Sequence, residues 1–127
     1  MNYYYITGAS RGIGKAIAEA LLKNENNVVH GISRNHHIDH PNYERHTLDL
    51  SNPDHAASFN FETHRDAGTI VLINNAGDVG ELVKLGGLDN TKIVKDYNLN
   101  LVSPSILINN FIQVYRDHAA AKQIINQ

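Results

Sequence analysis

A glycine-rich turn between a strand-like and a helix-like segment constrains the fold of this chain more than any other feature. Gly8, Gly12 and Gly14 stand in the spacing G-x3-G-x-G. Such a tight turn needs backbone angles that glycine tolerates readily, and a side chain there would hold the backbone away from a bound diphosphate. The following helix would aim free N–H groups and its positive dipole end at that anion. The pattern favours a dinucleotide-binding turn, with an ordinary glycine-rich loop as the alternative.

Strand-like and helix-like segments alternate along all 127 residues, which is typical of a single α/β domain built on a parallel sheet. Right-handed crossovers predict a doubly wound sheet of strand order 3-2-1-4-5, with a ligand crevice where strands 1 and 4 part. The predicted strands are Tyr3–Thr7, Val28–Ser33, Glu44–Leu48, Thr69–Ile73 and a fifth that begins at Lys122. The predicted helices are Ile13–Asn24, Ser51–His64 and Asp89–Ala119, and the main loops are His36–Asn42 and Gly77–Gly87.

Apolar spacing predicts which helix faces are buried. Ile13, Ile17 and Leu21 repeat at i, i+4 and i+8, with alanines between them for close packing. The last helix carries two apolar stripes, Leu107–Phe111–Val114 and Ile108–Ile112–Tyr115. The two stripes together span about 160° of the helix surface, which is wider than one core-facing stripe requires. We expect one stripe to cover the sheet and the other to meet a partner, with a helix partly buried under a long loop as the alternative.

Composition excludes several classes of protein. Lys and Arg number 11 against 13 Asp and Glu, a net charge of −2, whereas a protein that binds nucleic acid would carry a basic surface. No apolar run approaches the roughly 18 residues that a membrane span needs, and the N-terminus lacks the pattern of a signal peptide. The chain has no cysteine, which excludes disulfides and thiolate metal sites. We expect a cytoplasmic protein without nucleic-acid or membrane partners.

Two motifs carry a resemblance to a known family. Residues 7–14, TGASRGIG, resemble the cofactor motif of the short-chain dehydrogenase/reductase (SDR) family, and residues 74–77, NNAG, resemble its second motif. The two motifs occur in the same order as in the family and about sixty residues apart, and together they are a far more specific sign of the family than either motif alone. The resemblance implies a Rossmann-like fold. It runs along the whole chain, which covers about the first half of a typical member, so we expect the sheet to be truncated at the fifth strand.

The end of the second predicted strand indicates which dinucleotide would bind. An NAD-preferring site usually places a carboxylate there, but this chain has Ser33 and Arg34. Arg34, with Arg11 from the glycine turn, would pair with the 2′-phosphate of NADP, because a guanidinium matches phosphate in charge and geometry. NAD is therefore the less favoured cofactor. The structural alternative is that Arg34 is a solvated surface side chain.

The resemblance assigns further groups to the cofactor. Asp49 would accept a hydrogen bond from the adenine amino group and Leu50 would flank the ring, whereas Asn74 would tie the fourth strand to the glycine turn. A helix N-cap is the alternative for Asp49, although Ser51 suits that role better. The full predicted cofactor site is Gly8, Ser10, Arg11, Gly12, Ile13, Gly14, Ser33, Arg34, Asp49, Leu50, Asn75, Ala76 and Gly77.

The resemblance also implies a catalytic set of Asn, Ser, Tyr and Lys, in which the tyrosine donates a proton to the substrate carbonyl as hydride arrives. Only the asparagine, Asn100, can be placed. Pro104 has no N–H for the carbonyl of Asn100 four residues earlier, and in the family that carbonyl holds a water; a plain helix kink is the alternative. No tyrosine has a lysine four residues later. We expect the N-terminal portion of a reductase, which alone binds cofactor at best.

Eight histidines raise the question of a metal. His36, His37 and His40 share one loop, but no carboxylate arrangement completes a recognisable site there, and we expect no metal. In the family the helices over residues 89–119 often form a subunit interface, which implies a homo-oligomer, a dimer in the first instance.

Two hypotheses follow. The first is the cofactor-binding portion of an NADP-dependent oxidoreductase that acts on a small-molecule carbonyl or alcohol. The alternative is a non-catalytic dinucleotide-binding or assembly module that uses the fold without the reaction.

Overall fold

Five parallel strands form one sheet in the order β3-β2-β1-β4-β5, which confirms the predicted topology. The computed structural model describes residues 1–77 and 86–127. The strands are β1 (Asn2–Thr7), β2 (Asn27–Ser33), β3 (Tyr43–Thr47), β4 (Thr69–Asn74) and β5 (Ala121–Asn126). Each lies within one residue of its predicted bounds. Central strand β1 pairs with β2 on one side and β4 on the other, so the carboxyl ends of these strands meet at one edge of the sheet.

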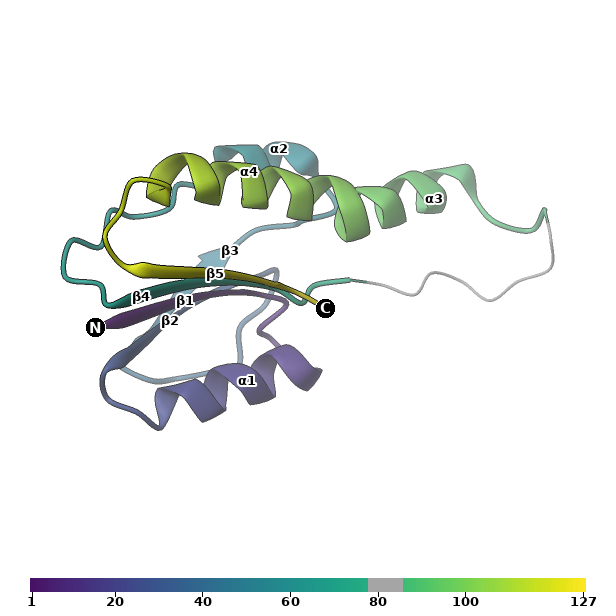
Figure 1. Cartoon of the computed structure of the whole chain (residues 1–127). Coiled ribbons are helices and arrows are strands. Elements are labelled where there is room, and N and C mark those ends of the chain that lie inside the picture. Colours follow the sequence, from purple (N-terminus) through teal and green to yellow (C-terminus); the bar gives the residue numbers. More distant parts are fainter. Residues whose placement is uncertain (78–85) are drawn as a thin grey trace.

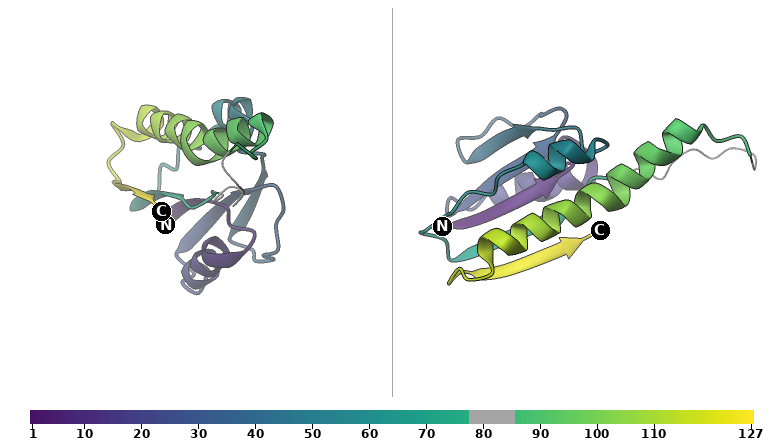
Figure 2. Two further views of the ribbon diagram at one scale, coloured as in Figure 1. Left: turned by 90° about the vertical axis from the view of Figure 1, so that its right-hand side faces the viewer. Right: turned by 90° about the horizontal axis from the view of Figure 1, so that it is seen from above.

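Helices cover both faces of the sheet (Figure 1). Helix α1 (Gly12–Leu22) lies on one face, and α2 (Pro53–Ser58) and α4 (Ser103–Tyr115) lie on the other. The left view of Figure 2 shows the resulting three layers, with the purple α1 opposite the green α4. Helix α3 (Asn90–Tyr97) joins α4 through a π-helical turn, η1 (Asn98–Val102). No helix in the described ranges is long and apolar enough to cross a membrane.

Two hydrophobic clusters hold the layers together, one on each face. The cluster under α4 brings together β1, β2 and β4 with the fully buried Tyr5, Leu72 and Tyr115. The cluster under α1 contains Ile6 and Ala18. Strand residues alternate between the two clusters because neighbouring side chains of a strand point to opposite faces.

The buried face of α1 differs from the prediction. Gly14, Ala18 and Leu22 are its buried residues, Ile17 and Leu21 pack at the edge, and Ile13 is 67% exposed. The physical reason is that at Gly14 the helix backbone lies directly against the carbonyl of Gly8, just after β1, so that no side chain fits between the two. The stripe of large residues in the sequence therefore lies to one side of the line of residues that α1 buries, and that line begins with the small residues Gly14 and Ala18.

The helix predicted over Ser51–His64 is wrong at both ends. Helix α2 covers only Pro53–Ser58, and its N-cap is Asn52, whose Oδ1 accepts from the backbone N–H of Asp54 at 3.0 Å. After Ser58 the chain is extended, so Phe59 and Phe61 are buried while Asn60 between them is exposed. The two rings pack edge-on against Tyr5. Alternation of apolar and polar residues with a period of two is typical of extended chain, and here it outweighs the helix predicted from the start signals at Ser51 and Pro53.

The helix predicted over Asp89–Ala119 is present in segments. Asp89 caps it as expected, accepting from the N–H of Thr91 at 2.8 Å. The π-helical turn stands just before Pro104, and α4 ends at Tyr115. The predicted stripes of α4 need correction: the buried line is Ser103, Leu107, Phe111 and Tyr115, at i+4 spacing, whereas Ile112 and Val114 are exposed. The predicted Gly77–Gly87 loop falls mostly on residues 78–85, outside the described part of the chain.

Candidate cofactor site

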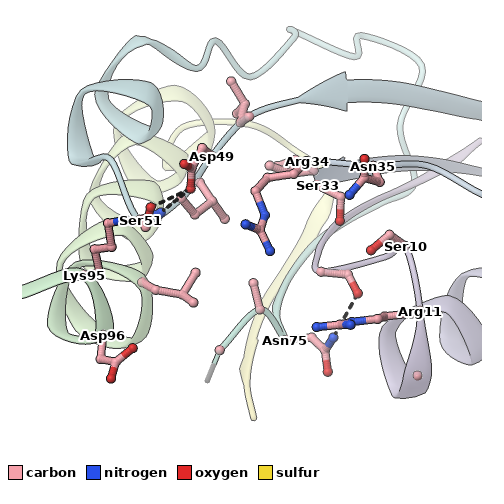
Figure 3. A pocket seen from close by; sticks show the side chains of 18 of the residues that line it. Ser10, Arg11, Ser33, Arg34, Asn35, Asp49, Ser51, Asn75, Lys95 and Asp96 are labelled. Atoms are coloured by element: carbon pink, nitrogen blue, oxygen red, sulfur yellow. Dashed lines mark hydrogen bonds between the residues drawn. The ribbon is translucent and has the colours of Figure 1, made fainter. Parts of the chain in front are cut away.

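A cavity of about 660 Å³ lies at the carboxyl ends of β1, β2 and β4 and beside the start of α1. It occupies the place that the strand order predicts, where the chain leaves β1 and β4 in opposite directions. Figure 3 shows its polar side chains converging from the two sides. The predicted residues that line it are Gly8, Ser10, Arg11, Gly12, Ser33, Arg34, Asp49, Leu50, Asn75, Ala76 and Gly77.

The glycine turn is shaped by main-chain contacts. Gly8 and Gly12 have φ of +69° and +59°, in the region that glycine adopts without strain. Gly14 is required for a different reason: a Cβ there would lie 2.2 Å from the carbonyl oxygen of Gly8. Ile13 and Gly14, both predicted to bind cofactor, do not line the cavity, because Gly14 is buried under the turn and Ile13 faces outward.

The first turn of α1 can receive an anion. The side chain of the N-cap residue, Arg11, makes no capping hydrogen bond, and the first turn contains no acidic residue. The first intrahelical backbone bond there is from Lys15 to the carbonyl of Arg11. The amides ahead of it have no acceptor within the helix, and they stand at the positive end of the helix dipole, next to Gly12 in the cavity lining. A diphosphate is the kind of group that this arrangement stabilises.

The second motif is bonded to the glycine turn. The hydroxyl of Thr7 accepts from the N–H groups of Asn75 and Ala76 at 2.9 and 3.0 Å, and the Asn75 side chain donates to the carbonyl of Gly8 at 3.3 Å. Asn75, and not Asn74 as predicted, thus ties β4 to the turn. The Asn74 side chain donates instead to Asn126 of β5 at 3.0 Å, because it is the last residue of the strand and faces its neighbour.

Cationic groups stand near the end of β2. Arg34 extends into the cavity, with Asp49 and Ser51 on one side of it and Ser10 and Arg11 on the other (Figure 3). The Ser51 hydroxyl donates to Asp49 at 2.7 Å and the Ser51 N–H donates to the same oxygen at 3.0 Å. These bonds, aided by the charge of Arg34, hold the pKa of Asp49 below its usual range against a smaller effect of burial. Asp49 is therefore an ionised acceptor at neutral pH.

Helix α3 and the π-helical turn after it add residues that the motifs did not indicate. Lys92, Lys95 and Asp96 of α3 and Leu99 of η1 line the cavity from the side opposite the glycine turn, and Lys92 pairs with Asp96. Their i, i+3, i+4, i+7 spacing is typical of one helix face, and it is the sequence signal that could have found them. Other lining residues outside the prediction are Ile32, Asn35, His37, Leu48 and Ser51.

Asn100 lies beside the cavity and not in its lining. It belongs to the π-helical turn, is exposed, and its side-chain oxygen lies close to Gly77, where an added Cβ would be 3.1 Å away. The alternative interpretation of Pro104 was a plain helix kink; the structure has a wider π-helical turn just before it, in which the N–H of Ser103 bonds to the carbonyl of Asn98. Asn100 thus lies next to the second motif, as its predicted role requires.

Comparisons with known proteins agree with this geometry. The family described as short chain dehydrogenase matches residues 2–126. Benzil reductase ((S)-benzoin forming) of Bacillus subtilis (strain 168) is 34% identical over 99% of this chain and 54% of that protein. A short-chain dehydrogenase/reductase from Burkholderia vietnamiensis has a TM-score of 0.85 at 25% identity, over 98% of this chain and 61% of that one.

Two similar structures contain cofactor. A metagenomic short-chain oxidoreductase in complex with NADP is 27% identical, with a TM-score of 0.78 over 98% of this chain and 60% of that one. The 4-hydroxyisoleucine dehydrogenase complexed with NADH is 25% identical, with a TM-score of 0.75 over 99% and 55%. The chain spans about half the length of the curated relatives it matches. With the family's two motifs joined around one cavity, the chain belongs to the short-chain dehydrogenase/reductase family.

Proposed function

We propose that this chain is the cofactor-binding portion of an NADP-dependent short-chain oxidoreductase, which interconverts a carbonyl and an alcohol by hydride transfer. The observation that carries the proposal is the uncapped N-terminus of α1 beneath a glycine turn, in the same cavity as Arg11 and Arg34. A nicotinamide dinucleotide supplies the hydride. The similarity to a benzil reductase supports a small-molecule carbonyl compound as substrate.

Each part of the cavity has a counterpart in NADP. The diphosphate would lie on the amides of residues 8–14, and Ser33, Arg34 and Arg11 would surround the 2′-phosphate. Asp49, ionised and held by Ser51, would accept from the adenine amino group, with Leu50 beside the ring. Asn75, Ala76 and Gly77 would contact the adenosine ribose. Asn100 is the member of the catalytic set that this chain supplies, as a residue positioned next to Gly77.

The test of the cofactor assignment is an affinity measurement. NADPH should bind more tightly than NADH, and Arg34→Ala should weaken NADPH by roughly ten- to a hundredfold, the loss expected for a hydrogen bond between charged groups. NADH affinity should change little. Arg65→Ala is the matched control, because Arg65 is exposed and does not line the cavity. Equal titration curves for the two cofactors in the unmodified chain would contradict the proposal.

The second candidate is a non-catalytic dinucleotide-binding or assembly module. It is favoured by one observation: none of the six tyrosines is followed by a lysine at the fourth position. Both candidates are compatible with a homo-oligomer through the helices over 89–119. Exposed Val94, Tyr97 and Leu101 support that assembly, because they form one apolar stripe at i, i+3 and i+7.

A further inference from the structure

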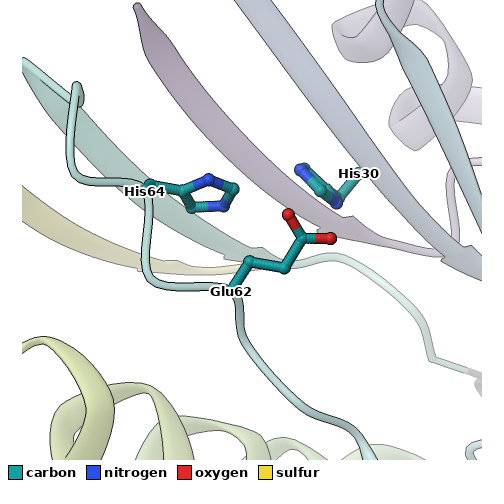
Figure 4. Close-up of side chains that lie close together, drawn as sticks. All are labelled: His30, Glu62 and His64. Atoms are coloured by element: carbon teal, nitrogen blue, oxygen red, sulfur yellow. The ribbon is translucent and has the colours of Figure 1, made fainter.

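A second cluster of polar side chains lies on the sheet face that α2 and α4 cover, and none of its members lines the cofactor cavity. It gathers around the buried His30 of β2. Glu44 and His46 of β3 stand on one side, and Glu62 and His64 come from the extended segment after α2. We call these five residues the histidine–glutamate cluster. Figure 4 shows part of it, with the Glu62 carboxylate directed toward the His30 ring.

Three of the five side chains already have the separations of metal ligands. Nδ1 of His30 lies 2.9 Å from Nε2 of His46 and 3.0 Å from a carboxylate oxygen of Glu44. That oxygen is 3.9 Å from Nε2 of His46. In tetrahedral zinc sites, bonds of about 2.0–2.1 Å place ligand atoms about 3.3–3.4 Å apart. The three observed separations bracket that value, so shifts of a few tenths of an ångström would accommodate an ion.

The rings of His30 and His46 face each other within the cluster. Nδ1 of His30 and Nε2 of His46 are 2.9 Å apart, at hydrogen-bond distance, so the two nitrogens share a single proton. A metal ion can replace that proton if the His30 proton moves to its other nitrogen. Glu62, whose carboxylate is within 4.8 Å of a His30 nitrogen, is the acceptor available to hold it there.

His64 is not included among the proposed ligands, because its Nε2 already has a partner. It lies 2.6 Å from the hydroxyl of Tyr5, which also accepts from the N–H of Glu62 at 3.2 Å. This hydrogen bond occupies Nε2 of His64 whichever of the two groups supplies the proton. The loop histidines are excluded as well. His36 bonds Tyr43 and His40 accepts from Asn42, and no group of candidate ligands in the described residues includes them.

We propose that His30, Glu44 and His46 form a binding site for a divalent transition-metal ion of the zinc class. The side chains of Glu44 and His46 are 54% and 25% exposed, so an ion can enter from solvent and keep a water in its fourth position. The ligands come from β2 and from β3, which is an edge strand paired with β2 alone among the described strands. The ion would thus fasten the edge of the sheet, which stabilises the fold by mass action.

The test is calorimetric titration of the chelator-treated chain with Zn²⁺. A single Zn²⁺ per chain should bind and raise the melting temperature, whereas Mg²⁺, which prefers oxygen ligands, should do neither. His46→Gln and Glu44→Gln should each weaken Zn²⁺ binding by on the order of tenfold or more. These two side chains are used because His30 is a core residue whose loss would also affect folding. Co²⁺ should give the absorption of a tetrahedral ion, and the His46→Gln variant should lose it.

Two control variants make the ligand set falsifiable. His64→Gln and the exposed His37→Gln should both keep Zn²⁺ affinity. No binding to the unmodified chain would overturn the proposal. So would binding that survives in His46→Gln, or that is lost in either control. The melting temperature of every variant in chelator shows that it is folded before metal is added.

Discussion

At the scale of single residues, two glycines of the same turn are needed for different reasons. Gly12 has a positive φ, but an added Cβ would have open space around it, whereas Gly14 has a helical backbone and a Cβ there would collide with the Gly8 carbonyl. The glycine motif predicted both positions without separating these causes. Backbone angles explain the need for glycine at Gly8 and Gly12 but not at Gly14, whose role depends on how closely α1 approaches the Gly8 carbonyl.

The difference leads to a prediction. Gly12→Ala should cost about 1 kcal/mol of unfolding free energy, the usual strain of a left-handed alanine. Gly14→Ala should cost about 2–3 kcal/mol, since main-chain atoms must move apart, and it should also weaken NADPH binding by displacing the turn. Urea denaturation of the two variants gives the comparison. A Gly14→Ala variant as stable as Gly12→Ala would show that the contact is not tight.

The residues of the histidine–glutamate cluster could not be predicted from sequence. His30 and His46 are 16 positions apart, and they meet because β2 and β3 pair in the register that sets His30 opposite Glu44 and Ile32 opposite His46. A shift of one residue would turn these side chains to the opposite face. Sequence spacing instead drew attention to His36, His37 and His40, which are neighbours in the chain but belong to neither candidate ligand group in the described residues.

At the scale of elements, the way α4 is fastened depends on one hydroxyl. Ser103 is fully buried and donates to the carbonyl of Leu50 at 2.6 Å, which ties the start of α4 to the segment that lines the cofactor cavity. Ser105, two residues later, is exposed and donates locally to the carbonyl of Leu101 in the π-helical turn at 2.7 Å. The two serines form a matched pair.

Ser103→Ala should lower the unfolding free energy by about 1–3 kcal/mol, because it leaves the buried Leu50 carbonyl without its donor. Ser105→Ala should change it by no more than about 0.5 kcal/mol. Chemical denaturation of both variants, with NADPH affinity measured alongside, checks this. Equal effects of the two substitutions would mean that Ser103 does not fasten the helix.

Strands were easier to predict than helices in this chain, for a physical reason. The central strands β2 and β4 contain short apolar or β-branched runs next to turn residues, so their bounds are visible locally. Helix α2 ends where the apolar alternation of Phe59 and Phe61 turns toward the aromatic core, a contact with α4 that is distant in sequence. The predicted buried stripe of α4 was wrong because the line of residues that the helix buries includes Ser103, a polar residue that an apolar pattern leaves out.

At the scale of the whole molecule, the chain spans about half the length of the curated relatives it matches, and its two motifs meet at one cavity with Asn100 beside it. No tyrosine among the 127 residues has a lysine four positions later, which is the pattern of the family's acid. The two proposed functions, an oxidoreductase portion and a non-catalytic module, therefore both predict that this chain alone binds cofactor without turnover. They differ in whether further residues of the protein supply the acid.

The isolated chain should bind NADPH but should not oxidise it when a ketone such as benzil is added, because no tuned acid protonates the carbonyl as hydride leaves. Absorbance of NADPH with and without benzil measures turnover, and fluorescence titration measures binding under the same conditions. Turnover above the rate without ketone would refute the forecast and would require an acid outside the tyrosine–lysine pattern.

The contact between Gly8 and Gly14 has a consequence for how fast a ligand can bind. Since the start of the glycine turn at Gly8 lies directly against α1 at Gly14, we expect the turn to keep the same shape with and without a ligand. A diphosphate then meets a rigid receptor, so little of its binding free energy is lost to immobilising flexible chain. Capture should be limited by diffusional encounter and not by a preceding rearrangement.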